Sequence, residues 1–277
     1  MRYTSRMAKR DTILVYSTPP AETGDLLPSL YETFGNTDIN IKQIWADDVV
    51  QGDVLRSDRS VLILPGAPYS QGYRDQLNGA GFKNIRDAIH DHKLNMLGIC
   101  CSAYLSCPNY SFTHPDGEFV THTSELALID ATAHGPIDDL KPLEGLAGTR
   151  WHNLKIAPLS FKGANGQEQH AAVAYSRGPL LSLADESQHK IIARFNTVSG
   201  KPPAIIGSEF GAGKIALAST PIELRGASLK KQFENGPFKN IDPEDFEKGR
   251  IYSNALAAQE GKRDELWGQI WDYLLER

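Results

Sequence analysis

Three short apolar runs, each followed by turn-forming residues, most constrain the fold of this 277-residue chain. They cover residues 12–16, 61–64 and 95–98. Ser-Thr-Pro-Pro follows the first run, Pro-Gly-Ala-Pro follows the second, and two adjacent cysteines follow the glycine that ends the third. Near-continuous apolar strands separated by helix-length segments are typical of a parallel sheet covered on both faces. We therefore expect three buried, parallel strands.

The segments between these runs have the pattern of amphipathic helices. Residues 24–34 (GDLLPSLYETF) and 82–90 (FKNIRDAIH) place apolar side chains at helical spacing. Right-handed crossovers then bring the carboxyl ends of all three strands to one edge of the sheet. Ligands bind at that edge in open sheets of this kind. The predicted fold class is α/β, with a doubly wound, mostly parallel sheet.

The middle of the chain, roughly residues 108–200, has a different pattern. Four segments separated by Gly, Pro and Asn turns predict an inserted antiparallel β portion: 125–129, 151–156, 170–175 and 191–195. Beyond it we expect a hairpin, formed by residues 204–206 and 215–218 on either side of the turn GAGK. The chain then ends in a predicted helix over residues 262–276, with one apolar face made of Leu266, Ile270, Trp271, Leu274 and Leu275. No repeat or linker is visible, so we expect one domain over residues 1–277.

Charge and cysteine content narrow the function classes. The formal net charge is −5 and the pI is about 5.9, which disfavours nucleic acid and anionic membranes as partners. No run of about 18 apolar residues could span a bilayer, and no secretory signal pattern opens the chain. Three cysteines, two of them adjacent, are a poor disulfide framework. We expect a cytoplasmic, bacterial protein whose partner is a small molecule.

The segment MLGICCSAY at residues 96–104 has the composition of a strand that turns sharply into a helix. Small residues are needed there because the backbone is crowded, and the residue at the apex, Cys100, is exposed above the sheet. A helix N-terminus favours thiolate and lowers the thiol pKa. The N–H of Cys101 and a second N–H from the loop at Gly66 and Ala67 would form an oxyanion hole.

Simpler interpretations of the cysteines remain open. A cysteine at the end of a strand is often an inert, small apolar residue, and we expect this of Cys107. The spacing of the three cysteines does not fit a zinc site, and no histidine cluster completes one. We therefore expect neither a metal nor a cofactor.

The chain resembles the N-terminal domain that is attached to eukaryotic-type biotin-protein ligases. The resemblance rests on LILPGAPYSQGYRDQLNGAGFKNIRDAI followed by LGICCSAYL, and on VYSTPPA, ELALIDATAHGPI and FGAGKIALASTPIEL in the same order. These motifs cover residues 12 to about 225, which is most of the chain. The Gly/Arg-rich loop and the Lys-bearing motif of the ligase catalytic domain are not found, so we expect no biotinylation by this chain alone.

This resemblance implies a class I glutamine amidotransferase-like, flavodoxin-like fold. Enzymes of that class release ammonia with a Cys–His–Glu triad. By the family motif, Cys100 takes the nucleophile position and Glu223 takes the acid position, whereas Pro221 stands where the histidine is expected. Proline cannot accept a proton, so the usual general base is missing. His134, in the segment ATAHGPI, is our first substitute, ahead of His122 and His152.

The loop and helix after the second strand offer ligand-binding residues. Tyr69, Arg74 and Asn78 would contact a ligand, and Arg74 suits a carboxylate or phosphate. The alternative for Arg74 is a bracing contact with a carboxylate of the fold.

Three hypotheses follow for function. The first is a cysteine-dependent hydrolase or acyl transferase acting on an amide, ester or thioester, with a degenerate triad. The second is a binding or regulatory module that kept the pocket after losing catalysis. The third is a redox sensor that uses the adjacent thiols, which we rank last because a disulfide between neighbours is strained.

Overall fold

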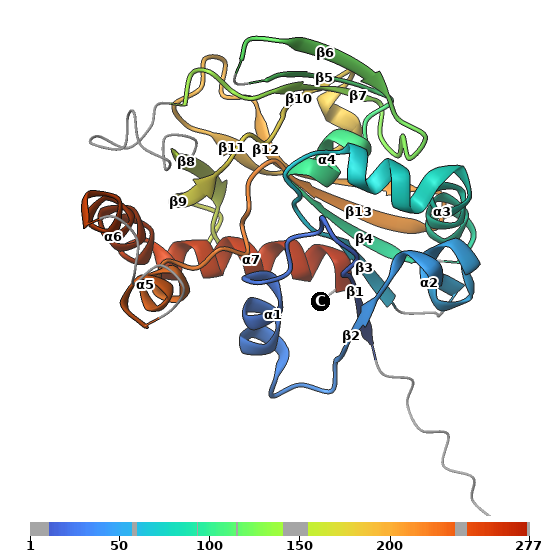
Figure 1. The fold of residues 1–277 in the computed structure, drawn as a ribbon, viewed down its shortest axis with the longest axis horizontal. Helices are drawn as coiled ribbons and strands as arrows, with labels where there is room; N and C mark the ends of the chain where they lie inside the picture. The colour runs from blue at the N-terminus through green and yellow to red at the C-terminus, as the bar shows by residue number, and fades with distance from the viewer. Residues whose placement is uncertain are drawn as a thin grey trace, which may run out of the picture.

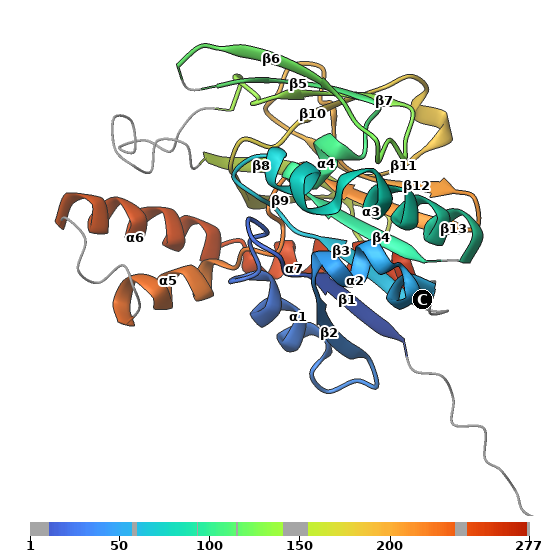
Figure 2. The same cartoon turned by 45° about the vertical axis from the view of Figure 1, so that its right-hand side comes forward.

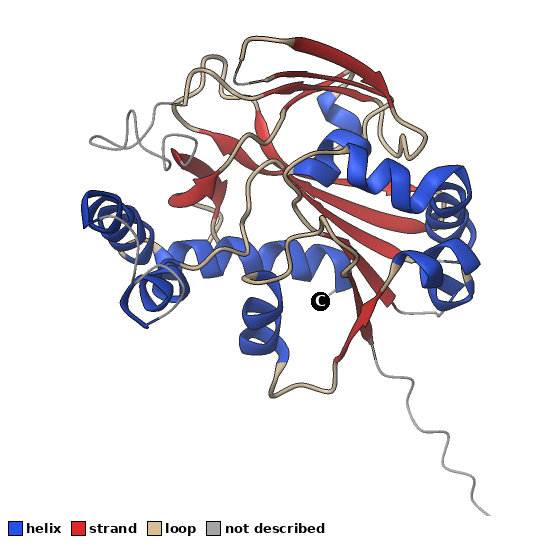
Figure 3. Cartoon of the chain, in the orientation of Figure 1, coloured by secondary structure: helices blue, strands red, loops and turns tan. Residues whose placement is uncertain are grey.

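The computed structural model describes residues 11–56, 60–92, 94–114, 116–140, 155–235 and 243–275. These residues form two sheets with helices around them (Figure 1, Figure 3). The large sheet has nine strands: β2 (Asn40–Ile44), β1 (Thr12–Tyr16), β3 (Ser60–Leu64), β4 (Asn95–Ile99), β13 (Gly213–Ala218), β12 (Pro203–Phe210), β11 (Lys190–Phe195), β8 (Lys155–Lys162) and β9 (Glu168–Tyr175), in that spatial order. The small sheet has four: β10 (Leu180–Leu183), β7 (Ala131–Gly135), β5 (Asn109–Thr113) and β6 (Phe119–Thr123).

The α/β fold class is confirmed, and the prediction of a mostly parallel sheet is only partly confirmed. Strands β2, β1, β3, β4 and β13 pair in parallel. From β13 onward every pairing is antiparallel, through β12, β11, β8 and β9. Parallel neighbours need a crossover connection, whereas β12 and β13 are joined by a tight turn and so pair antiparallel. The inserted strands therefore extend the large sheet as well as building the small one.

Helices cover both faces of the large sheet. On one face lie α2 (Ala46–Gln51), the 3₁₀ helix η1 (Asp53–Arg56), α3 (Gln71–His92) and α4 (Cys101–Leu105), and on the other lie α1 (Leu26–Phe34) and α7 (Glu260–Leu275). The remaining two, α5 (Gly226–Asn235) and α6 (Pro243–Ala257), pack against each other beside the β9 end of the sheet (Figure 2). The small sheet packs over α4 through Tyr110, Ala131, Ala133 and Leu181.

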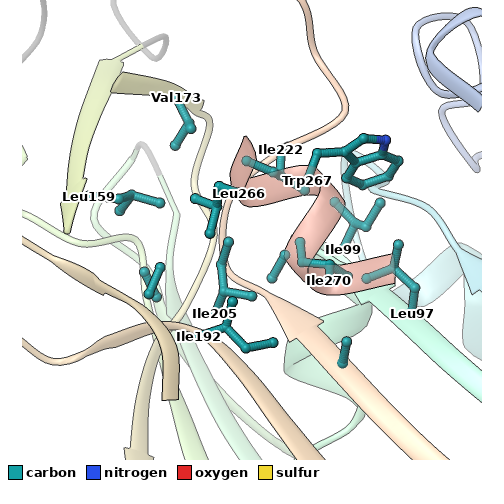
Figure 4. Close-up of a cluster of buried hydrophobic side chains, with 14 of the residues drawn as sticks. Leu97, Ile99, Leu159, Val173, Ile192, Ile205, Ile222, Leu266, Trp267 and Ile270 are labelled. Carbon is teal, nitrogen blue, oxygen red and sulfur yellow. The ribbon is translucent and has the colours of Figure 1, made fainter. Parts of the chain in front are cut away.

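The predicted C-terminal helix is confirmed as α7, and its apolar face enters the larger core. Figure 4 shows Leu266, Trp267 and Ile270 of α7 packed against side chains of β4 and β12. The indole of Trp271 meets the ring of Phe34 edge-on, with centroids 4.8 Å apart. Burial of this face fixes α7, and with it the loop after β13, against the sheet.

The strand predicted over residues 125–129 is wrong. Leu126, Leu128 and Ile129 are buried, but the backbone here makes no ladder and Ala127 has a φ of 34°. Instead, the N–H groups of Ala127 and Leu128 donate to carbonyls at the end of α4. The guanidinium of Arg86 donates to the carbonyls of Leu126 and Ala127. The apolar run thus fills the core as a loop, and the strand is β7 just after it.

Other expectations shift only at their boundaries. The segments predicted at 170–175 and 191–195 are β9 and β11, and the predicted hairpin is β12–β13. The strand predicted at 151–156 is seen from Lys155 as β8, and residues 151–154 lie outside the described part of the chain. In the residues that the structure describes, no helix is long and apolar enough to cross a membrane.

Candidate functional site at the strand β4 elbow

The chain bends sharply at Cys100, between the end of β4 and the start of α4. Cys100 has φ 51° and ψ −101°, a conformation that L-amino acids rarely adopt. Its N–H donates to the carbonyl of Ala218 at 2.8 Å, and its carbonyl accepts from the N–H of Ala103 at 3.0 Å. Backbone strain of this kind is concentrated at functional sites. The bend leaves Cys100 partly exposed while Cys101 is buried.

The loop after β3 lies directly beside the bend. A methyl group added to Gly66 would be 3.6 Å from Cβ of Cys100 and 3.8 Å from Oε2 of Glu22. The Gly66 carbonyl accepts from the N–H of Glu22 at 2.8 Å. The Pro65 carbonyl accepts from the hydroxyls of Ser102 and Tyr73, both at 2.8 Å. The loops after β1, β3 and β4 are thereby held together, as the sheet-edge rule requires.

The thiol of Cys100 is a hydrogen-bond donor in this structure. Its Sγ donates to the carbonyl of Ser176 at 3.3 Å. Burial raises the pKa of this thiol well above its ordinary value, with further increases from Cys101, Glu223 and Glu22, and the N–H of Cys101 opposes them. The expectation of a lowered pKa is wrong. Helix α4 has only five residues, so its dipole is weak beside the loss of water and the nearby acidic groups.

Glu223 is buried behind the elbow in the loop after β13. The pKa of its carboxyl is raised to about 8, mainly by burial; a backbone hydrogen bond and Arg263 lower this pKa, and Asp25 and Glu22 raise it. Its Oε2 has no hydrogen-bond partner among the described residues. At neutral pH this carboxyl is therefore mostly protonated and uncharged.

The histidines of the described part of the chain do not act on the Cys100 thiol. None bonds to it and none is among the groups that shift its pKa. His134 lies on β7, where its Nδ1 is 2.8 Å from Oγ of Ser111. Because Ala133 faces the core and side chains alternate along a strand, His134 points to the opposite face of the small sheet.

That outer face is hollowed by an open cavity of about 750 Å³. His134 and Ser111 line it together with threonines of β5, β6 and β7, and Cys100 is not among its lining residues. His122 stacks near Tyr110, with ring centroids 5.2 Å apart. His152 lies outside the described residues. The structure thus brings Cys100, Gly66 and Glu223 to one edge of the sheet, and it places His134 elsewhere.

The three predicted ligand-binding residues take different positions. The side chain of Tyr69 is 59% exposed. Arg74 donates to the hydroxyl of Tyr110 at 2.5 Å and to Oε1 of Gln71. Asn78 forms a break within α3, with φ 45° and ψ −167°, and its Oδ1 accepts from the N–H of Ala80 at 3.0 Å. Ala67 is partly exposed next to Gly66.

Two residues beside Cys100 were not predicted from the sequence. Glu22 follows the first predicted strand, and the sheet-edge rule could have placed it near the elbow. Ser176 contributes a backbone carbonyl after β9, for which the sequence has no signal. In the described residues, no group of three or more His, Cys, Asp or Glu side chains could hold a metal ion.

The fold and the elbow define an α/β protein with a cysteine at a strand-to-helix bend. Its family follows from the sequence: the chain belongs to the family "Biotin-protein ligase, N terminal", whose sequence model matches residues 13–261. A relative from Chlamydia muridarum (strain MoPn / Nigg), named only "Uncharacterized protein", is 27% identical over 176 residues. The match covers 63% of this chain and 64% of that relative.

Solved structures with a similar overall arrangement share little sequence. One is described as a glutamine amidotransferase; it is 15% identical, with a TM-score of 0.48, covering 88% of this chain and 98% of that chain. Another is an exo-β-1,4-mannosidase from Opitutaceae bacterium strain TAV5, 12% identical, with a TM-score of 0.45, covering 90% of this chain and 36% of that chain.

Proposed function

We propose that this protein is a small-molecule-binding module that has kept an amidotransferase-like pocket without the chemistry of a Cys–His–Glu triad. The observation that carries the proposal is the state of the Cys100 thiol, which donates to the Ser176 carbonyl and has a raised pKa. A cysteine attacks as thiolate, so a thiol held protonated by its surroundings is a poor nucleophile.

The electrostatics around Cys100 support the same interpretation. Glu22 and Glu223 raise the pKa of the thiol, and no imidazole acts in the opposite direction among the described residues. In a triad, the histidine accepts the thiol proton and the glutamate orients the histidine. Pro221, at the expected histidine position, cannot accept the thiol proton, and Glu223, mostly protonated, does not supply the carboxylate of a triad.

The polar groups at the elbow favour a ligand with an amide or amino group. Burial raises the pKa of Glu22, and the neighbouring Asp25 raises it further; burial also raises the pKa of Asp25. Where they ionise, both side chains carry negative charge and repel an anionic ligand. The carboxyl oxygens of Glu22 can accept from N–H groups of a ligand, and the N–H of Cys101 can donate to a ligand carbonyl. An amide offers both kinds of partner.

Ligand binding tests the proposal directly. Glutamine and acetamide are titrated against the full chain by calorimetry and by thermal shift. The same titrations are made with the variants Cys100→Ala and Glu22→Gln. The control is Glu168→Gln, which changes an exposed carboxylate far along the sheet. We expect saturable binding that changes by less than about threefold in Cys100→Ala, weakens in Glu22→Gln and is unchanged in Glu168→Gln. Turnover of glutamine that Cys100→Ala abolishes, or no binding of either compound, contradicts the proposal.

A second candidate, a cysteine-dependent hydrolase or acyl transferase, is favoured by the elbow itself. Cys100 would be the nucleophile, and the N–H groups of Cys101 and Ala67, beside Gly66, would stabilise an oxyanion. The strained φ of Cys100 and the N–H of Cys101 at its sulfur support this role. Iodoacetamide labelling separates the candidates: a rate that rises only above about pH 9 fits a binding module, and a midpoint below about pH 7.5 fits an enzyme.

A further inference from the structure

A chain of hydrogen bonds links the start of α3 to the small sheet, away from the partners of Cys100. Nη1 of Arg74 donates to the hydroxyl of Tyr110 at 2.5 Å. That hydroxyl lies 3.0 Å from Oγ of Ser70. The Tyr110 side chain is only 4% exposed, whereas Arg74, Ser70 and His122 are partly exposed and open to a solute.

The positive charge of Arg74 is not balanced by a direct ion pair in the described part of the chain. Its two hydrogen-bond partners, Tyr110 and Gln71, are neutral. The nearby carboxylate of Asp75 bonds to the amide of Gln71 at 2.5 Å and reaches Arg74 only through it. The bracing ion pair that was the alternative for Arg74 is therefore not seen.

His122 adds a second titratable basic side chain beside the Tyr110 ring. Its imidazole centroid is 5.2 Å from that of Tyr110. Burial lowers the pKa of His122, and the neighbouring side chains of Arg74 and His114 lower it further; no carboxylate is among the groups that shift it. The imidazole is therefore mostly uncharged at neutral pH, and the positive charge at this place is that of Arg74, in a chain of net charge −5.

We propose that Arg74, Ser70, Tyr110 and His122 form a subsite for an oxyanion, a phosphate or carboxylate group of a small ligand. Arg74 supplies the permanent charge and its remaining N–H groups. The Tyr110 oxygen accepts from Arg74, and its own proton can be donated to Ser70, which leaves the Ser70 proton for the ligand. His122 closes the subsite, and an anion favours its protonated form.

This inference does not depend on the chemistry of Cys100. The elbow site is acidic, with Glu22 and Glu223 near the thiol, whereas the Arg74 subsite has the positive charge of Arg74. The two sites are close enough for Arg74 to lower the pKa of Cys101. The two sites use different side chains, so a variant at one site leaves the side chains of the other in place.

The test is a titration of the full chain with inorganic phosphate, and in a parallel arm with acetate, at constant ionic strength. Nuclear magnetic resonance reports the ring signals of His122, and calorimetry gives the affinity. We expect saturable binding of one of the two anions with movement of the His122 signals. Arg74→Gln should weaken it at least about tenfold, because the charge-assisted hydrogen bonds are lost. The arm that binds identifies phosphate or carboxylate chemistry.

Control variants keep a folding defect from being mistaken for loss of the subsite. Arg250→Gln removes an arginine that is paired with Glu247 on α6, and this variant should bind the anion as wild type does. Tyr110→Phe keeps the ring against His122 and should weaken binding less than Arg74→Gln does. Equal affinity in wild type and Arg74→Gln, or no saturable effect of either anion, overturns the proposal.

Discussion

Replacing Glu223 by glutamine should change how the stability of this protein depends on pH. The ordinary pKa of a glutamate is 4.5, and burial raises that of Glu223 to about 8. Below pH 4.5 the carboxyl is protonated in both the folded and the unfolded chain and contributes no pH dependence. Between pH 4.5 and 8 the unfolded chain loses the proton while the folded chain retains it, so the free energy of unfolding falls as pH rises.

The size of this effect follows from the shift. Each pKa unit corresponds to about 1.4 kcal/mol, so a difference of about 3.5 units sets an upper limit of about 5 kcal/mol. Water entry and side-chain movement on ionisation recover part of this cost, which leaves about 2–4 kcal/mol. Glutamine has a similar shape and does not titrate. The stability of Glu223→Gln relative to wild type should therefore increase by that amount from pH 4.5 to pH 8 and then level off.

Urea unfolding at pH 4.5, 6, 7 and 8 measures this difference. Asp25 and Glu22 also have raised pKa values, but they are present in both proteins and largely cancel in the comparison. Glu168→Gln, at an exposed position, should give a difference that does not vary with pH. Parallel stability curves for wild type and Glu223→Gln would refute the argument that this carboxyl is buried and protonated.

Three further predictions concern backbone geometry and are measured by chemical or thermal unfolding. Cys100→Gly should be more stable than Cys100→Ala by about 1 kcal/mol, because only glycine adopts φ 51° without strain; the reverse order would contradict the strained elbow. Asn78→Gly should leave the stability nearly unchanged, while Asn78→Ala should cost about 1–3 kcal/mol of stability through backbone strain and loss of the hydrogen bond to Ala80. Equal stabilities of the two variants would argue against the break in α3. Gly178→Ala should cost about 3 kcal/mol or more of folding stability, because the new methyl would lie 1.7 Å from the carbonyl oxygen of Ser219. Its control, Gly268→Ala, lies in open space on α7 and should stabilise the protein by about 0.5–1 kcal/mol. A neutral Gly178→Ala would show that the loop shifts freely.

The sequence by itself determined the parallel half of the large sheet and the position of the elbow. The apolar runs at 12–16, 61–64 and 95–98 are β1, β3 and β4, and the small residues around Cys100 mark the bend. These features depend on the order of apolar, turn-forming and small residues within about ten positions. Such patterns are local in the sequence, so they can be recognised without knowing which distant residues contact them.

The tertiary structure alone decided the chemistry of the elbow. The state of the Cys100 thiol depends on Glu22, Ser176 and Glu223, which are far from it in sequence and reach it through the sheet edge and the loop after β9. The direction of His134 depends on which face of β7 is buried. Burial and charge are sums over all neighbours in space, so a helix N-terminus that favours thiolate in isolation is outweighed once water is removed and acidic groups are brought in.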